Sequence, residues 1–360
     1  MTDAPTTAPV APAASSTSAG EVLAGYLTAQ AGVFLRALPQ AVGEAGSRPG
    51  ALPASAAAAD DLLRAVRRVG GALHTFAVAF EPAWARESRA ELRWLLNLLA
   101  SEPAYQRRSA RLLAALDSLA DPGPDAPGML AGHAGAPKAR ALLDRQLTLA
   151  RTRAHTAVLQ ELRSARLHAL ADRMTLLAGE VPLAEGCAGE PAEALLPQAA
   201  AALGALAEAA ELLPLQRSAV PYGGEGLHRL GSGGTPGAGA ARTGADSEAV
   251  LAADDEPWLR ARILLKRARY ALEVCGSPVA GLDELDRVLG RHQEASDAAV
   301  TAATAARTPR ITPATAYVLG VVHADQRLEV EAARYAFGLQ WPVLAPGLGH
   351  WEGPPAPRKG

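Results

Sequence analysis

Apolar side chains recur along this chain every three or four residues, which is the spacing of one face of an α-helix. The first such stretch covers residues 21–42, where Val22, Leu23, Tyr26 and Leu27 begin the pattern and the Gly43–Pro53 segment breaks it. Similar stretches, separated by breaks that contain Pro or Gly, predict helices at 57–80, 82–100, 103–119, 192–213, 254–273, 282–302 and 313–337. Residues 138–177 are predicted to form one long helix or a kinked pair.

Composition supports the same fold class. The chain is 49% hydrophobic but only 4% aromatic, and Ala, Leu, Arg and Glu dominate, which favours helices over strands. The expected fold is therefore all-α, with about nine helices in two bundle-like halves at about 20–120 and 136–338, within one domain at 20–342.

Three segments lack helical periodicity. Residues 1–19 form a Pro/Ala/Ser/Thr tract that we expect to be disordered, and residues 343–360 form a Pro/Gly-rich tail. Residues 214–253 contain GSGGTPGAGAARTG and are predicted to be a flexible linker. This glycine-rich run is not a phosphate-binding Walker loop, because it lacks the closing G-K-[ST].

Charge and targeting signals narrow the function classes. The formal net charge of −2 argues against a protein that coats nucleic acid through overall basicity. The N-terminus lacks the pattern of a signal peptide, and no apolar run approaches the roughly 18 residues that span a bilayer. Cys187 and Cys275 lie far apart in sequence, so neither a disulfide framework nor a zinc site is indicated. We expect a cytoplasmic protein without a membrane partner.

The most informative stretch is DDEPWLRARILLKRARYALE at 254–273, because its predicted helix carries five cations on its polar side. Arg262, Lys266 and Arg269 fall on one stripe, and Arg260 and Arg267 fall on a neighbouring one. Surface arginines are most often solvated or paired with acids. That explanation is weaker for this set, because no acid lies between Arg260 and Tyr270 to relieve the repulsion.

An earlier stretch, DDLLRAVRRVGGALHTF at 60–76, repeats the pattern. Arg64, Arg67 and Arg68 share an arc, and Arg67-Arg68 correspond to Lys266-Arg267 of the later stretch. Two copies of a basic helix indicate an internal duplication.

Together with RWLLNLL, RSARLHALADR and LDELDRVLGRHQEA, these stretches resemble the conserved-histidine α-helical domain, or CHAD, family over roughly residues 20–342. The most specific part is 262–294, where the basic helix is followed by L-x-x-V-L-G-x-H-Q. The resemblance implies an all-helical fold of two pseudo-symmetric four-helix halves around a basic groove or channel. It also implies non-enzymatic binding of inorganic polyphosphate, without a cofactor, and association with polyphosphate granules.

The chain departs from the family pattern at several positions. The name-giving histidines correspond to Asp60 and Leu259, and the stretch from Arg173 to Arg217 contains no intervening Lys, Arg or His. These departures favour an alternative, a CHAD-fold scaffold for protein–protein interaction that has lost polyphosphate binding.

Polyphosphate presents closely spaced anionic oxygens, which guanidinium groups can bind in bidentate fashion. We expect its binding residues to be Arg64, Arg67, Arg68, Arg93, Arg262, Lys266, Arg267, Arg269 and His292. His292 also continues the apolar face of Leu285 and Val288, so a buried core histidine is the alternative. His74 is a weaker candidate.

An enzymatic function has little support in the sequence. A Glu329-x-Glu331 pair is followed by Ala333 inside a predicted helix, unlike the Glu-x-Glu-x-Lys signature of triphosphate-processing tunnels. No H-E-x-x-H or G-x-S-x-G motif occurs. Nucleic-acid binding is disfavoured because the cations are not interleaved with aromatic residues.

Overall fold

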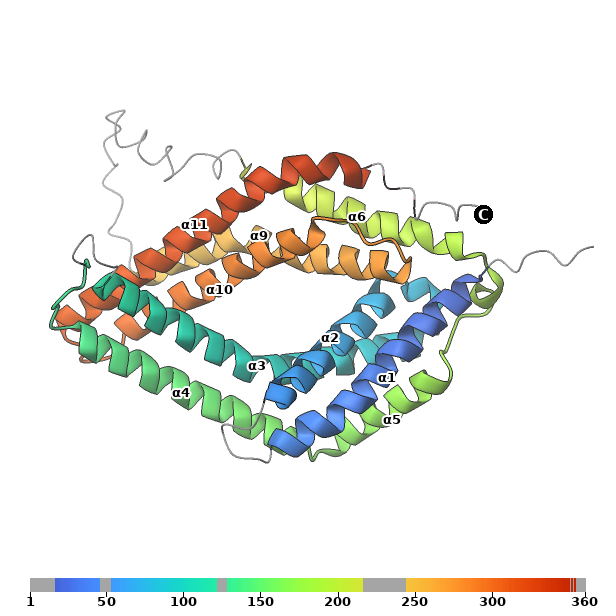
Figure 1. Ribbon diagram of the computed structural model, residues 1–360, viewed down its shortest axis with the longest axis horizontal. Helices are drawn as coiled ribbons and strands as arrows, with labels where there is room; N and C mark the ends of the chain where they lie inside the picture. Colours follow the sequence, from blue (N-terminus) through green and yellow to red (C-terminus); the bar gives the residue numbers. More distant parts are fainter. Residues whose placement is uncertain are drawn as a thin grey trace, which may run out of the picture.

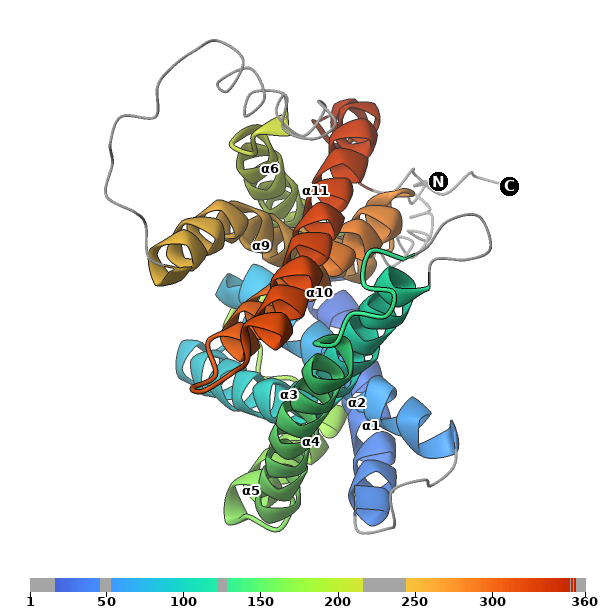
Figure 2. The same cartoon turned by 90° about the vertical axis from the view of Figure 1, so that its left-hand side faces the viewer.

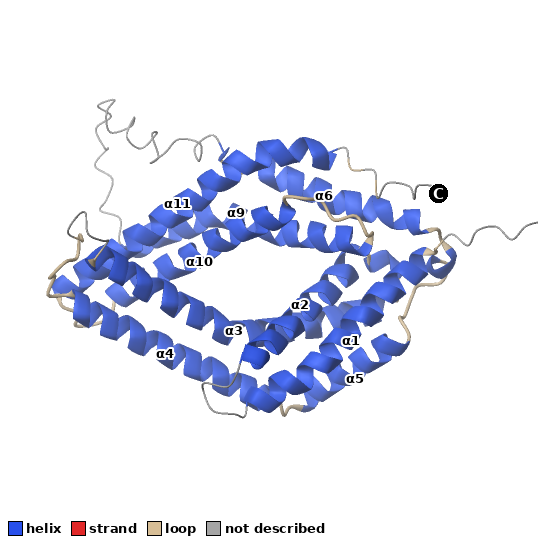
Figure 3. Cartoon of the chain, in the orientation of Figure 1, coloured by secondary structure: helices blue, strands red, loops and turns tan. Residues whose placement is uncertain are grey.

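The computed structural model describes residues 17–45, 53–121, 128–215, 244–349, 351 and 353. Across these ranges the chain forms nine α-helices and no strand, as Figure 3 shows, with isolated β-bridges at Ser18–Pro191 and Phe80–Leu183. The predicted all-α class is confirmed. The helices are α1 Ala19–Ala45, α2 Pro53–Thr75, α3 Pro82–Ala120, α4 Ala136–Glu161, α5 Ala165–Gly179, α6 Leu196–Glu211, α9 Gly244–Val274, α10 Leu282–Ala306 and α11 Pro313–Gly349.

Helix α3 is continuous where the sequence predicts two helices separated near Pro103. Its start is fixed by Glu81, whose carboxylate accepts the backbone N–H groups of Ala83 and Trp84. Leu95 and Leu112, on either side of Pro103, are fully buried in different parts of the core. This packing at both ends explains why the helix continues through the proline despite the backbone hydrogen bond that proline cannot donate.

Residues 138–177 form the kinked pair rather than one helix. Helix α4 ends at Glu161 and α5 begins at Ala165. Ser164 is extended and its hydroxyl accepts the backbone N–H of Leu167, so it caps the new helix.

Two predicted boundaries differ from the structure. Helix α9 begins at Gly244, inside the predicted linker, and α11 continues through Pro342 and Pro346 to Gly349, inside the predicted tail. Residues 1–16 and 216–243, to which the disordered tail and most of the linker were assigned, lie outside the described residues.

Figures 1 and 2 show α1 to α5 in one half of the molecule and α6, α9, α10 and α11 in the other. The division therefore falls between α5 and α6, which corrects the predicted division between residues 120 and 136. The reason is visible in the core, where Leu170 and Met174 of α5 are buried in the same cluster as Leu23 of α1 and Leu73 of α2.

The described core consists of three apolar clusters. The first lies among α1, α2, α5 and the first part of α3 and reaches the other half through Ala199 of α6 and Ala271 of α9. The second lies among α6, α9, the first part of α10 and the last part of α11. The third also joins the halves, because it contains Leu112 of α3, Leu143 of α4, Ala302 of α10 and Leu319 of α11. None of the helices in the described ranges is long and apolar enough to cross a bilayer.

Candidate anion-binding site

The two basic helices, α2 and α9, are in direct contact. A Cβ atom on Gly71 of α2 would lie 2.7 Å from Cδ2 of Tyr270 on α9, so only glycine permits this approach. Beside this contact, Nε of Arg68 lies 2.8 Å from a carboxylate oxygen of Glu273. The cations of the two repeated basic stretches are thereby brought together where α2 and α9 are in contact.

A buried ionic network fixes the start of the basic part of α9. Asp255 is 2% exposed, and its carboxylate accepts two hydrogen bonds from Arg327, at 2.7 and 3.1 Å, and one from Arg334, at 2.6 Å. The hydroxyl of Ser296 donates to the same carboxylate at 2.5 Å. The network ties α9 to α10 and α11, and the adjacent arginines hold the pKa of Asp255 below its usual value despite burial.

Arg67 of α2 faces Arg262 and Lys266 of α9. Burial lowers the pKa of both α9 side chains, and the positive charge of Arg67 lowers each further. Arg67 forms no ion pair with any residue in the described ranges. Three cations from two helices are therefore held close together with incomplete neutralisation.

Carboxylates of helix α10 neutralise part of the positive charge on α9. Nζ of Lys266 lies 2.9 Å from Asp286, and Nη1 of Arg269 lies 2.6 Å from the same carboxylate. Arg269 also pairs with Asp283. Arg262 donates to the neutral amide oxygen of Gln293 and forms no ion pair with a described residue, although the charge of Asp286 opposes the lowering of its pKa by burial.

A second group, made of two arginines and a histidine, joins α2, α3 and α9. Nη2 of Arg89 lies 2.7 Å from Nδ1 of His74. The pKa of His74 is lowered to about 4 by burial and by the charges of Arg267 and Arg89. Burial and Arg89 likewise lower the pKa of Arg267. No described acid pairs with any of these three side chains.

We refer to Arg67, His74, Arg89, Arg262, Lys266 and Arg267 together as the cationic face. Arg89 was not among the predicted binding residues, although it follows the arginine stripe of its helix. Arg89 lies four residues before Arg93, a predicted binding residue, and this helical spacing is the sequence signal that could have identified it. Arg93 itself is exposed and has no acidic partner among the described residues.

Two predicted residues lie beside the cationic face. Arg64 is exposed and pairs with Asp61 one turn earlier on the same helix. Arg68 is occupied by Glu273. The structure thus places Arg67 near Arg262 and Lys266, and Arg267 near His74 and Arg89, and it provides acidic partners for Arg64, Arg68, Lys266 and Arg269.

His292 is a core residue. It is 1% exposed, stacks on Trp258 with ring centroids 5.5 Å apart, and accepts a hydrogen bond at its Nε2 from Nε of Arg334 at 3.3 Å. Burial and the charge of Arg334 lower its pKa to about 4. The expectation that His292 donates to a bound anion is therefore corrected, because its ring does not reach solvent.

The described residues contain no cluster of three or more His, Cys, Asp and Glu side chains that could hold a metal ion. The chemistry that the cationic face offers is multivalent hydrogen bonding and charge attraction toward an extended anion.

The structure is therefore that of an all-helical protein in which two basic helices, α2 and α9, are in contact. The family model for the CHAD domain matches residues 41–306, so the chain belongs to the CHAD family.

The similar proteins of known structure are consistent with this assignment. PptA from Streptomyces chartreusis is 42% identical, with 91% of this chain and 100% of that chain covered and a TM-score of 0.71. The CHAD domain from the plant Ricinus communis is 19% identical, with 98% and 99% covered and a TM-score of 0.52, and shares the fold. No match was found among curated proteins.

Proposed function

We propose that this protein binds inorganic polyphosphate along the cationic face. The observation that carries the proposal is the gathering of cations where α2 and α9 are in contact, with no acidic partner for Arg67, Arg89 or Arg267 among the described residues. The charge of Arg67 lowers the pKa of Arg262 and Lys266, as that of Arg89 lowers the pKa of Arg267. Like charges held this close destabilise the fold unless an anion compensates. A linear polyanion supplies many oxygens to several guanidinium groups at once.

The arrangement of helices supports a ligand path between the two halves of the molecule. Helices α1–α2–α3–α4 and α6–α9–α10–α11 contact one another in the same order, which supports the predicted duplication. The duplication places α2 and α9 at equivalent positions. A polyphosphate chain that follows the cationic face would run from Arg262 past Arg67 to Arg267 and Arg89, with Arg93 beyond. The path would be the basic channel that the family resemblance implies.

We infer that the protein binds polyphosphate without transforming it, because the cationic face contains donors but no candidate nucleophile or ionised base. A cytoplasmic protein that attaches to polyphosphate granules fits this role. Nucleic acid is a less suitable ligand, since the cationic face contains no Phe, Tyr or Trp for stacking bases, and the neighbouring Tyr270 is packed against Gly71.

The alternative function is a helical scaffold that has lost the ligand. The acid pairs of Arg64, Arg68, Lys266 and Arg269 favour it. The absence of cations in α6 favours it as well. The scaffold hypothesis predicts that polyphosphate binding is absent or indifferent to the cationic face.

The deciding experiment is biolayer interferometry with immobilised long-chain polyphosphate at two salt concentrations. The double variant R67A/R267A removes two guanidinium groups that have no described acidic partner, and we expect its affinity to fall at least about tenfold, since charged hydrogen bonds contribute roughly 1.5–3 kcal/mol each. The affinity of the wild type should fall as salt rises.

The matched control is R151A/R153A, which removes the same charge from exposed positions of α4. We expect this variant to bind within about twofold of the wild type, because its arginines lie on a solvated helix surface. Equal losses in the two double variants, or no binding by the wild type, would support the scaffold instead.

A further inference from the structure

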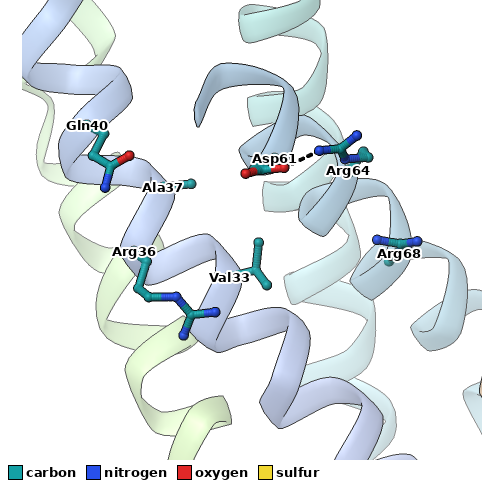
Figure 4. Close-up of a pocket in the computed structure, with 7 residues that line it drawn as sticks. All are labelled: Val33, Arg36, Ala37, Gln40, Asp61, Arg64 and Arg68. Carbon is teal, nitrogen blue, oxygen red and sulfur yellow. Dashed lines mark hydrogen bonds and ion pairs between the residues drawn. The ribbon is translucent and has the colours of Figure 1, made fainter. Parts of the chain in front are cut away.

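A pocket of about 450 Å³ lies between α1 and α2, beside the cationic face. It is lined by Val33, Arg36, Ala37, Gln40, Asp61, Arg64 and Arg68. Figure 4 shows Arg36 and Gln40 on α1 across the pocket from Arg64 and Arg68 on α2. Its volume falls within the roughly 300–1,000 Å³ range of small-molecule sites.

The lining carries more positive than negative charge. Three arginines face one acid, Asp61, which pairs with Arg64. Arg36 is exposed and forms no ion pair with any residue that the structure describes. Arg68 reaches Glu273 on α9 through its Nε while its side chain lines the pocket. The pocket therefore has an unneutralised guanidinium on one wall and two partly neutralised ones on the other.

The chemistry of the lining selects among anions. Donors on opposite walls require a ligand whose oxygens point in several directions, which phosphoryl groups provide and a single planar carboxylate does not. The amide of Gln40 can donate to a further oxygen. Val33 and Ala37 form the apolar part of the wall.

We propose that this pocket binds a short oligophosphate, either free or as the end of a longer chain, and that Arg36 is a specificity-determining residue. The ligand class follows from the proposed function, but the site is a different one, since none of the cationic-face residues lines it. Arg68 lies at its boundary, between the pocket and Glu273 of α9. A chain end held there would position the rest of a polyphosphate chain beside the crossing of α2 and α9.

Isothermal titration calorimetry with sodium tripolyphosphate tests the proposal on the full chain. We expect Arg36→Ala to weaken tripolyphosphate binding about tenfold or more, and Arg36→Lys to recover part of the loss, because lysine retains the charge but not the bidentate geometry. The control variant R151A/R153A, on exposed positions of α4, should bind tripolyphosphate within about twofold of the wild type, since neither arginine lines the pocket.

The outcomes separate this site from the proposed function. Tripolyphosphate binding that is absent from the wild type, unchanged in Arg36→Ala, or lowered as much by R151A/R153A as by Arg36→Ala would overturn the pocket assignment. Failure of R67A/R267A to weaken long-chain binding, with Arg36→Ala still weakening tripolyphosphate binding, would instead overturn the cationic face and leave the pocket in place.

Discussion

Gly71 of α2 packs against Tyr270 of α9, so that a Cβ on residue 71 would lie 2.7 Å from Cδ2 of the tyrosine ring. The same Cβ would also lie 3.2 Å from Cβ of Tyr270, close to the backbone of α9. A ring rotation alone therefore does not relieve the clash. The distance between the cations on α2 and those on α9 therefore depends on glycine at position 71.

The neighbouring glycine provides a matched comparison. We expect Gly71→Ala to push the helices apart and to lower the free energy of unfolding by about 1–3 kcal/mol, the usual cost of overpacking. Gly70→Ala should raise it by up to about 1 kcal/mol, because no atom lies within 4 Å of the added group and alanine is the better helix former. Urea denaturation of both variants measures the difference, and a stabilised Gly71→Ala would show that the helices are not in contact.

The ionic network at Asp255 gives a second prediction, on stability. Asp255→Asn would leave the buried guanidinium of Arg334 and that of Arg327 without their shared carboxylate, at a cost of about 3–5 kcal/mol in the free energy of unfolding. The adjacent Asp254 is exposed, so Asp254→Asn should change it by no more than about 0.5 kcal/mol. Thermal unfolding checks both. Equal effects of the two substitutions would mean that the network does not hold α9 in place.

Much of the fold could be predicted because helical periodicity is a local property. The pattern located α2, α9 and α10 and identified the basic stretches that meet at the cationic face. It failed at Pro103 and at Pro342, where helices continue through a proline because buried residues on both sides hold them. It also failed to assign α4 and α5 to the first half, since which helices share a core depends on tertiary contacts.

The site was predictable in residue type but less so in environment. The sequence selected Arg67, Arg262, Lys266 and Arg267, yet it could not show that Asp286 pairs with Lys266 or that Glu273 pairs with Arg68. The apolar spacing around His292 was compatible with a core position, and its burial in the structure shows that it is a core residue. The contribution of Arg89 depends on its contact with His74, which no sequence spacing encodes.

His74 connects ligand binding to pH. Without ligand its pKa is about 4, because burial and the charges of Arg267 and Arg89 disfavour the protonated ring. A polyanion on the cationic face would offset those charges and raise the pKa of His74. Protons would then be taken up on binding at any pH between the free and bound pKa values, so affinity should rise as pH falls through that window.

We therefore expect long-chain polyphosphate to bind more tightly at pH 5.5 than at pH 7.5 at constant ionic strength, with the increase reduced in His74→Gln. Calorimetry in two buffers of different ionisation enthalpy reports the proton uptake directly, and the variant corrects for protons taken up by other groups or by the ligand. Because glutamine keeps an acceptor for Arg89 but cannot become charged, it separates titration of His74 from its packing. Equal proton uptake by His74→Gln and the wild type would place the bound anion away from the His74, Arg89 and Arg267 group.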